Sequence, residues 1–252
     1  MAQKKYIYID ECGDPEFYGK RKKLLVGAEG YQPLLLIGMI VTDDRRKLWD
    51  EVTVFQNQIL TDSLYNSIHS VKQQGWYLHA KNDFPDVRSK FFEKLRDLED
   101  FESYIVIGRK SLDIFNNKHN NNAGEFYFDL LHHLLKGKIT NRSIKYEIYL
   151  SQREKSNMSR FAGAVKKGLT DMDGEILYKC HIVSSSVTPE LSITDYLLWA
   201  LQRYILKNED RFYKAVIDKY TEIYDIYDIK GEKVYDSNNA FDINKASGFD
   251  IK

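Results

Sequence analysis

The chain has 252 residues, 43% of them hydrophobic and 29% charged, which suffices to bury the core of one large domain or two small ones. Lysine and arginine together number 37, as do aspartate and glutamate. This balance argues against a general polyanion binder, which is normally basic overall. Local basic patches such as Lys20 to Lys23 are compatible with it.

Two further features bear on the compartment. The longest apolar run, Leu34 to Val41, is too short to span a bilayer, and the first residues show no signal-peptide pattern. Cys12 and Cys180 provide no disulfide framework, and neither has a partner at zinc-binding spacing. We therefore expect a cytoplasmic protein that does not enter a membrane.

Strand and helix patterns are both visible along the chain. Five runs combine β-branched or aromatic residues with the alternation typical of strands. They cover residues 5–10, 33–42, 103–109, 144–150 and 177–184. Apolar residues at helical spacing predict helices between and after these strands. The helices cover residues 45–59, 87–100, 124–136, 158–169 and 191–226, the last with a break near 207–210.

The order of these elements predicts the fold class. Three consecutive strands, followed by alternating helices and strands, imply a mixed sheet with helices packed on it. We predict an α/β fold: a ribonuclease H-like mixed five-stranded sheet with helices on both faces and a helical insertion, residues 43–100, after the second strand. Residues 1–230 would form this single domain. Residues 231–252 are polar and rich in Asn, Asp, Ser and Gly, which predicts an extended or disordered tail.

The first strand ends in a dense group of carboxylates, within Tyr-Ile-Tyr-Ile-Asp-Glu-Cys-Gly-Asp at residues 6–14. Gly13 allows the backbone to turn there, so that Asp10, Glu11 and Asp14 are presented together. Carboxylates this close repel one another unless a cation or a proton neutralises them, and Mg²⁺ prefers such oxygen ligands. The pattern therefore indicates either a metal site or an acidic turn that solvent screens.

In a ribonuclease H-like fold, the end of the first strand, the start of the following helix and the last helix converge on one cleft. Here these positions hold Asp10, Glu125 and Asp195. Asp195 lies in an apolar stripe, where a carboxylate is costly unless it is paired or metal-bound. Asp195 and Glu125 also stand where acids ordinarily complement a helix N-terminus, so a purely structural role stays open. On the functional interpretation, Asp10, Asp195 and Glu125 are the predicted ligands of Mg²⁺ or Mn²⁺.

The fourth strand lacks the carboxylate that metal-dependent nucleases of this architecture usually carry just beyond it. Ser151 occupies the position most like Asp10, and Glu154 in the following loop is the remaining candidate. His79 and Asp83, four residues apart, would share a helix face and orient a substrate or shuttle a proton. A cap formed by Asp83 beside a partly buried His79 explains the same pair equally well.

These motifs together resemble a bacterial family, the domain-of-unknown-function family numbered 3800. Its members open with a strand that ends in Asp-Glu-Ser-Gly-Asp, matched here by residues 10–14 with Cys12 in place of the serine. The resemblance covers most of the chain and continues with Leu78-His79-Ala80, Asp83, Val87-Arg88, Leu191 to Leu197, Trp199, Gln202-Arg203 and Asp210 to Tyr213. It implies a ribonuclease H-like fold and a divalent-metal nuclease. Its acidic core would be Asp10, Asp14 and Asp195, with His79 and Asp83 nearby.

We therefore predict a metal-dependent nuclease that hydrolyses phosphodiester bonds of RNA or DNA, its nucleic-acid partner. The candidate catalytic residues are Asp10, Asp14, Asp195, Glu125, Glu154 and His79. A role in phage defence or mobile-element biology is implied by the resemblance alone. The alternative is a catalytically inactive ribonuclease H-like interaction module within a larger complex, which Ser151 and the neutral net charge favour. Transposase-like strand transfer is a third interpretation, but we find no helix-turn-helix or zinc-binding appendage to recognise DNA ends.

Overall fold

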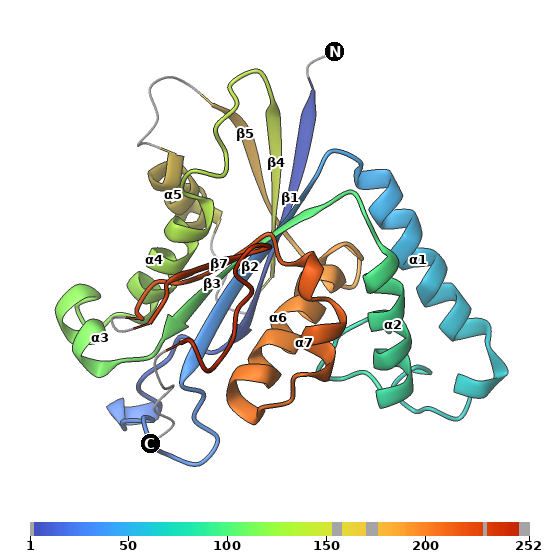
Figure 1. The fold of residues 1–252 in the computed structure, drawn as a ribbon, viewed down its shortest axis with the longest axis horizontal. Helices are drawn as coiled ribbons and strands as arrows, with labels where there is room; N and C mark the ends of the chain where they lie inside the picture. The colour runs from blue at the N-terminus through green and yellow to red at the C-terminus, as the bar shows by residue number, and fades with distance from the viewer. Residues whose placement is uncertain (1–2, 153–157, 170–175, 229–230, 247–252) are drawn as a thin grey trace.

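Seven strands form one mixed sheet in the computed structural model, which describes residues 3–152, 158–169, 176–228 and 231–246 (Figure 1). The strands are β1 (Lys4–Gly13), β2 (Leu34–Thr42), β3 (Glu102–Arg109), β4 (Lys145–Ser151), β5 (Leu177–Val183), β6 (Glu222–Asp225) and β7 (Val234–Asp236). Their order across the sheet is β5-β4-β1-β2-β3-β6-β7. All five predicted strands are present.

The directions of the first five strands define the fold. β2 runs antiparallel to its neighbours β1 and β3, whereas β1, β4 and β5 are parallel. α4 (Ala123–Leu135) lies in the connection from β3 to β4, and α5 (Met158–Leu169) lies in the crossover between the parallel neighbours β4 and β5. The order β5-β4-β1-β2-β3 with these directions is that of the ribonuclease H-like fold, which confirms the predicted fold class.

The sheet has two strands more than predicted. Residues 222–225, which were predicted to end the last helix, form β6 beside β3, and β7 pairs with β6 from within the predicted polar tail. The error has a physical reason, since β6 is only four residues long and its alternation of half-buried and buried side chains is too short to stand out. The buried carboxylates of Asp225 and Asp228 pair with Arg109 on β3 at 2.8 and 3.1 Å, which ties this extension to the sheet.

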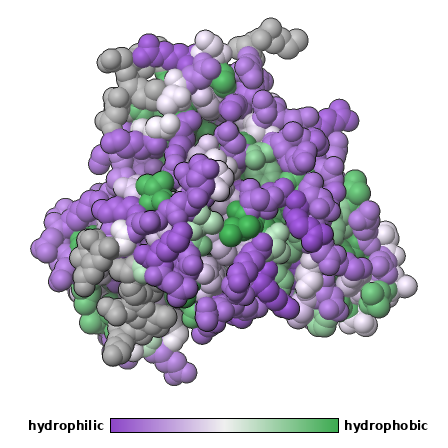
Figure 2. All heavy atoms as spheres, viewed as in Figure 1, coloured by the Kyte–Doolittle hydropathy of each residue, from purple (hydrophilic) through white to green (hydrophobic). Residues whose placement is uncertain are grey.

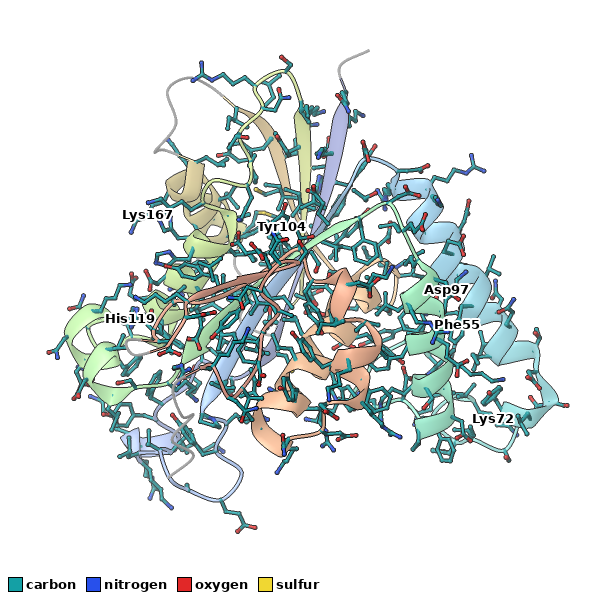
Figure 3. The ribbon with its side chains drawn as sticks, viewed as in Figure 1. Phe55, Lys72, Asp97, Tyr104, His119 and Lys167 are labelled. Atoms are coloured by element: carbon teal, nitrogen blue, oxygen red, sulfur yellow. The ribbon has the colours of Figure 1, made fainter. Side chains whose placement is uncertain are left out.

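Helices cover both faces of the sheet, as predicted (Figure 1). One layer contains α1 (Arg45–Thr61), α2 (Pro85–Asp97), α6 (Leu191–Lys207) and α7 (Arg211–Ala215), and the other contains α3 (Leu112–Lys118), α4 and α5. In Figure 3, Phe55 and Asp97 lie on the side of α1 and α2, and His119 and Lys167 lie on the opposite side. The insert after β2 is helical as predicted, with α1 and α2 in it. The helix α3 was not predicted.

The helices and the surface were compared with the requirements of a bilayer. Within the ranges given above, no helix combines the length and the apolar character needed to cross a bilayer. Hydrophilic residues dominate the face seen in Figure 2, and the hydrophobic residues on that face form small, separate patches.

The alternation of β1 decides which of its side chains face α6. Tyr8 belongs to the core on the α6 side, whereas Ile7 and Ile9 belong to the core on the α4 side. Asp10 therefore projects toward the α6 layer, because side chains two residues apart share a face. α6 lies close to the sheet here, since a Cβ on Gly38, the β2 partner of Asp10, would come within 2.9 Å of Leu198.

Candidate functional site

The three carboxylates at the end of β1 point in different directions. Asp10 faces the α6 layer, and one of its oxygens accepts the Glu11 backbone N–H at 2.9 Å. Glu11 faces the other layer, where the Tyr127 hydroxyl on α4 donates to it at 3.4 Å. Asp14 is exposed beyond the strand and accepts the Glu16 backbone N–H at 2.8 Å, as in a tight turn. The three acids were predicted to be presented together, but of the three we find only Asp10 facing the α6 layer.

Gly13 allows the backbone conformation at the last residue of β1. Its φ of +114° lies in a region that other residues rarely adopt, and an added Cβ would approach the Leu34 carbonyl oxygen to 2.5 Å. This path of the backbone, three residues after Asp10, therefore requires a residue without a side chain at position 13.

Asp195 comes to the same face from the second turn of α6. Its Oδ2 accepts the backbone N–H of Ala80 at 2.6 Å, and the side chain is 14% exposed. Burial raises the pKa of Asp195 to about 7, and the charge of Asp83 adds to this effect, whereas the Ala80 N–H and the charge of Arg88 oppose it. The side chain thus holds a carboxyl group that titrates near neutral pH.

His79 lies beside Asp195. Its Nδ1 is 3.8 Å from Asp195 Oδ2, which is too far for a hydrogen bond, and finds no hydrogen-bond partner among the described residues. Burial lowers the pKa of His79, so the imidazole is mainly neutral at pH 7. The side chain is one-third exposed, which leaves it accessible from solvent.

Asp83 has a different role from either of the predicted ones. Residues 79–83 form a turn rather than a helix, and α2 begins only at Pro85. The buried Asp83 carboxylate accepts the His79 backbone N–H at 2.8 Å, the Tyr196 hydroxyl at 2.5 Å and the Trp76 indole N–H at 3.2 Å. It therefore neither shares a helix face with His79 nor caps α2, but fastens the turn to α6.

Arg88 and Ser192 complete the attachment of this turn. The Arg88 guanidinium donates to the backbone carbonyls of Ala80 and Asp83, both at 2.6 Å, and lies over the Trp199 ring at 4.6 Å. The Ser192 hydroxyl donates to the Leu78 carbonyl at 2.8 Å. Two sequence motifs that are far apart in the chain, around residues 78–88 and 191–199, are therefore one unit in space.

The charges of Asp10 and Asp195 both act on Cys12 and on Tyr77. Burial is the main cause that raises the pKa of the Cys12 thiol, and the charges of Asp195 and Asp10 are the next largest causes. The same two charges also raise the pKa of Tyr77. The charge of the exposed Lys81 opposes the shift at Cys12. We call the residues Asp10, Cys12, His79, Lys81 and Asp195 the Asp10–Asp195 site. Lys81 was not predicted, although its position between His79 and Asp83 in the motif was a signal.

Ser151 lies beside Asp10 in the sheet, as predicted. β1 and β4 are parallel with Ile9 opposite Leu150, so the next residues, Asp10 and Ser151, are neighbours on one face. The Ser151 hydroxyl is buried and lies 3.1 Å from the Ser185 hydroxyl. This position thus presents hydroxyl groups where a carboxylate was expected, while Glu154 lies outside the described residues.

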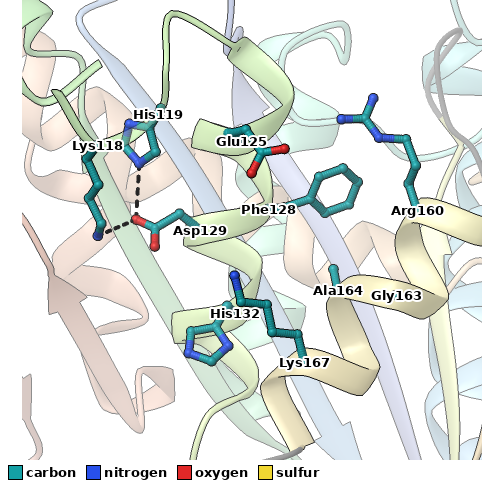
Figure 4. Close-up of a pocket in the computed structure, with 10 residues that line it drawn as sticks. All are labelled: Lys118, His119, Glu125, Phe128, Asp129, His132, Arg160, Gly163, Ala164 and Lys167. Atoms are coloured by element: carbon teal, nitrogen blue, oxygen red, sulfur yellow. Dashed lines mark hydrogen bonds and ion pairs between the residues drawn. The ribbon is translucent and has the colours of Figure 1, made fainter. Parts of the chain in front are cut away.

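Glu125 is placed elsewhere. It stands at the start of α4 and lines a pocket between α4 and α5 that also contains Lys118, Asp129 and Lys167 (Figure 4). Asp129 accepts hydrogen bonds from Lys118, His119 and Tyr227, which lower its pKa to about 2 despite burial. Glu125 thus belongs to the helix layer opposite to the one that Asp10 faces. The described residues contain no group of three or more His, Cys, Asp or Glu that could hold a metal ion.

The chain was compared with known protein families, curated proteins and solved structures. Neither the models of protein families nor the curated proteins gave a match to this sequence. Among solved structures, the ribonuclease H2 from Pyrococcus horikoshii OT3 is similar, with a TM-score of 0.48 and 18% sequence identity. The match covers 82% of this chain and 77% of that one. The fold assignment above depends on strand order and direction, and not on this similarity.

Proposed function

We propose that this chain is a nuclease that hydrolyses phosphodiester bonds at the Asp10–Asp195 site with the help of a divalent cation. The observation that carries the proposal is that Asp10 from the central strand and Asp195 from α6 both lie on the α6 side of the sheet, where the charge of each acts on Cys12. Membership in the domain-of-unknown-function family 3800 is part of the proposal. It is supported by the contacts between residues 78–88 and 191–199, which unite the motifs of that resemblance.

The side chains of the site fit a magnesium or manganese ion. A cation bound between Asp10 and Asp195 would neutralise two carboxylates on one side of the sheet. Mg²⁺ is commonly held by only one or two carboxylates, with waters and substrate phosphates as its other ligands. Asp10 and Asp195 would therefore hold a single ion, without a contribution from Glu125 or Ser151. When bound there, such an ion would supply Lewis-acid chemistry, polarising the phosphate and lowering the pKa of a bound water molecule.

Two other residues would act on the substrate. His79 stands beside Asp195 with a neutral imidazole that is one-third exposed. Because its Nδ1 is buried, Nε2 is the nitrogen that would accept a proton from the attacking water. Lys81 is exposed and cationic, so it can pair with a phosphate oxygen next to the scissile bond. The backbone bond from Ala80 to Asp195 fixes both residues relative to the carboxylate, because they flank Ala80 in the turn.

A cleavage assay tests this function. Purified protein is incubated with labelled single- and double-stranded RNA and DNA in Mn²⁺ or Mg²⁺, beside Asp10→Asn and Asp97→Asn variants. We expect metal-dependent cleavage that Asp10→Asn lowers on the order of 100-fold or more. Asp97 lies at the end of α2 with its side chain 74% exposed, so its variant is the matched control and should cleave like the wild type.

A catalytically inactive interaction module is the second candidate. The hydroxyl pair of Ser151 and Ser185 in place of a carboxylate favours it, because it leaves the site one acid short. Absence of cleavage of all four substrates, together with absence of Mn²⁺ binding, would support the module and reject the nuclease.

A further inference from the structure

The connection between β1 and β2 contains a short hairpin with a wholly cationic tip. Tyr18 and Leu24 form a β-bridge, and backbone N–H groups of Gly19 and Leu25 donate across the hairpin at 2.8 and 2.9 Å. The tip between them is Lys20 to Lys23, four successive basic residues that are all exposed. We call residues 17–25 the basic hairpin; it belongs to the blue loop at the lower left of Figure 1.

The base of the basic hairpin is fixed to the core. Phe17 is 1% exposed and stacks on Phe115 of α3, with ring centroids 3.9 Å apart. The buried Lys110 ammonium donates to the Glu16 carbonyl at 2.7 Å and lies over the rings of Phe17 and Tyr31. The tip is therefore carried by a rigid support, so that its charges are held at a constant place on the surface.

The charges of the tip are not neutralised by ion pairs within the described part of the chain. None of the ion pairs found between described residues involves Lys20, Arg21, Lys22 or Lys23. Arg21 and Lys22 have positive φ values of 58° and 57°, a conformation that costs non-glycine residues about 1 kcal/mol each. The chain thus keeps two large cations at positions where glycine would be more stable.

The location of the basic hairpin connects it to the Asp10–Asp195 site. The hairpin follows the C-terminal end of β1, and Asp10 lies near that end, so both are at the same edge of the sheet. Lys81 adds an exposed cation at the site itself. A polyanion that crosses this edge would meet cations at both places, although the whole chain is electrically neutral.

We propose that the basic hairpin binds the phosphate backbone of a nucleic acid at a distance from the scissile bond. The identity of the ligand rests on the proposed function; the surface itself does not. Four point charges on a rigid tip suit phosphates and give little base recognition. A lipid surface is a poorer fit, because insertion into a membrane needs several exposed apolar side chains beside the cations, and Leu24, which is 41% exposed, is the only large one in the basic hairpin.

The test measures binding without catalysis. Fluorescence anisotropy follows a labelled 20-nucleotide strand and its duplex in EDTA over a range of salt concentrations. Replacing all four tip residues by serine should weaken binding about 10- to 100-fold at low salt and reduce the slope of log K against log[salt] by about 2 to 3. The control replaces Arg46, Lys72, Lys179 and Lys233, four exposed cations outside the hairpin, by serine and removes the same net charge. It should change binding less than threefold.

A second variant separates charge from folding. Arg21→Gly with Lys22→Gly removes two charges and relieves both positive-φ positions, so its melting temperature should stay equal or rise. Weaker binding by this variant would support the proposal, whereas binding equal to that of the control would overturn it. Binding to vesicles that contain phosphatidylserine, with none to nucleic acid, would also overturn it. Because the assay contains no metal, loss of hairpin binding and loss of nuclease activity are observed separately.

Discussion

Asp195 has a structural function in the fold, to which the proposed nuclease activity would add a chemical one. Its Oδ2 holds the Ala80 backbone N–H at 2.6 Å, which positions the 79–83 turn against α6. Burial and the nearby Asp83 raise its pKa to about 7, so the folded protein retains a proton on it more tightly than the unfolded chain does. A bound cation would compete for the same carboxylate, so metal affinity should increase as pH rises toward neutrality.

The pH dependence of stability follows from this carboxyl group. A raised pKa in the folded state stabilises the protein at low pH, and this contribution is lost as pH rises from about 4, the unfolded value, to about 7. Asp195→Asn removes the titration. We expect the free energy of unfolding of the variant, minus that of the wild type, to increase by about 2 to 4 kcal/mol over this range in metal-free buffer. Urea denaturation at several pH values measures it, and a difference that does not change with pH would contradict the assignment.

At the level of elements, the turn at residues 79–83 and the helix α6 form one structural unit. Neither is a site alone, since Asp195 needs the turn for its hydrogen bond and the turn needs Asp83 and Arg88 for its shape. The sequence identified Asp83 and Asp195 in this unit, but it did not predict the turn or its contacts with α6. His79 and Asp83 were expected on a helix face because their spacing fits one. The turn is stabilised instead by the hydrogen bonds that Asp83 accepts from Tyr196 and Trp76, which local helix propensity does not predict.

Asp83 and Tyr196 should be strongly coupled. Asp83→Ala leaves a buried hydroxyl, an indole N–H and a backbone N–H without their acceptor, so we expect a loss of about 2 to 4 kcal/mol in unfolding free energy. Tyr196→Phe should cost about 1 to 2 kcal/mol, and the double variant clearly less than the sum. Asp86→Ala, an exposed acid in the first turn of α2, is the control and should cost less than about 1 kcal/mol. Additive losses in chemical denaturation would disprove the coupling.

At the scale of the whole molecule, the ribonuclease H-like sheet is extended beyond β3 by β6 and β7. Its central part was predictable because β1 to β5 are long and regularly patterned. The extension was not, since β6 and β7 have four and three residues and depend on a buried ion cluster for their place. Glu125 was placed with Asp10 by analogy with the fold, yet it lines a different pocket, because a helix start can face more than one neighbour.

The ion cluster at Arg109 should be essential for this extension. Asp225 and Asp228 are fully buried, and burial raises the pKa of Asp225 while Arg109 opposes the shift. Arg109→Met removes the cation between two buried carboxylates and should lower the unfolding free energy by about 3 to 5 kcal/mol. Arg96→Met, which removes an exposed cation paired with the exposed Asp97, should change it by less than about 1 kcal/mol. Equal effects of the two substitutions on the melting temperature would contradict this account.

Calorimetric titration with Mn²⁺ tests the central claim most directly, namely that Asp10 and Asp195 share one cation. We predict a single ion per chain for the wild-type protein, with the affinity reduced tenfold or more by Asp10→Asn and equally by Asp195→Asn. Asp97→Asn should bind like the wild type. Undiminished binding by both site variants, or a response of only one of them, would show that the two carboxylates do not form a common site.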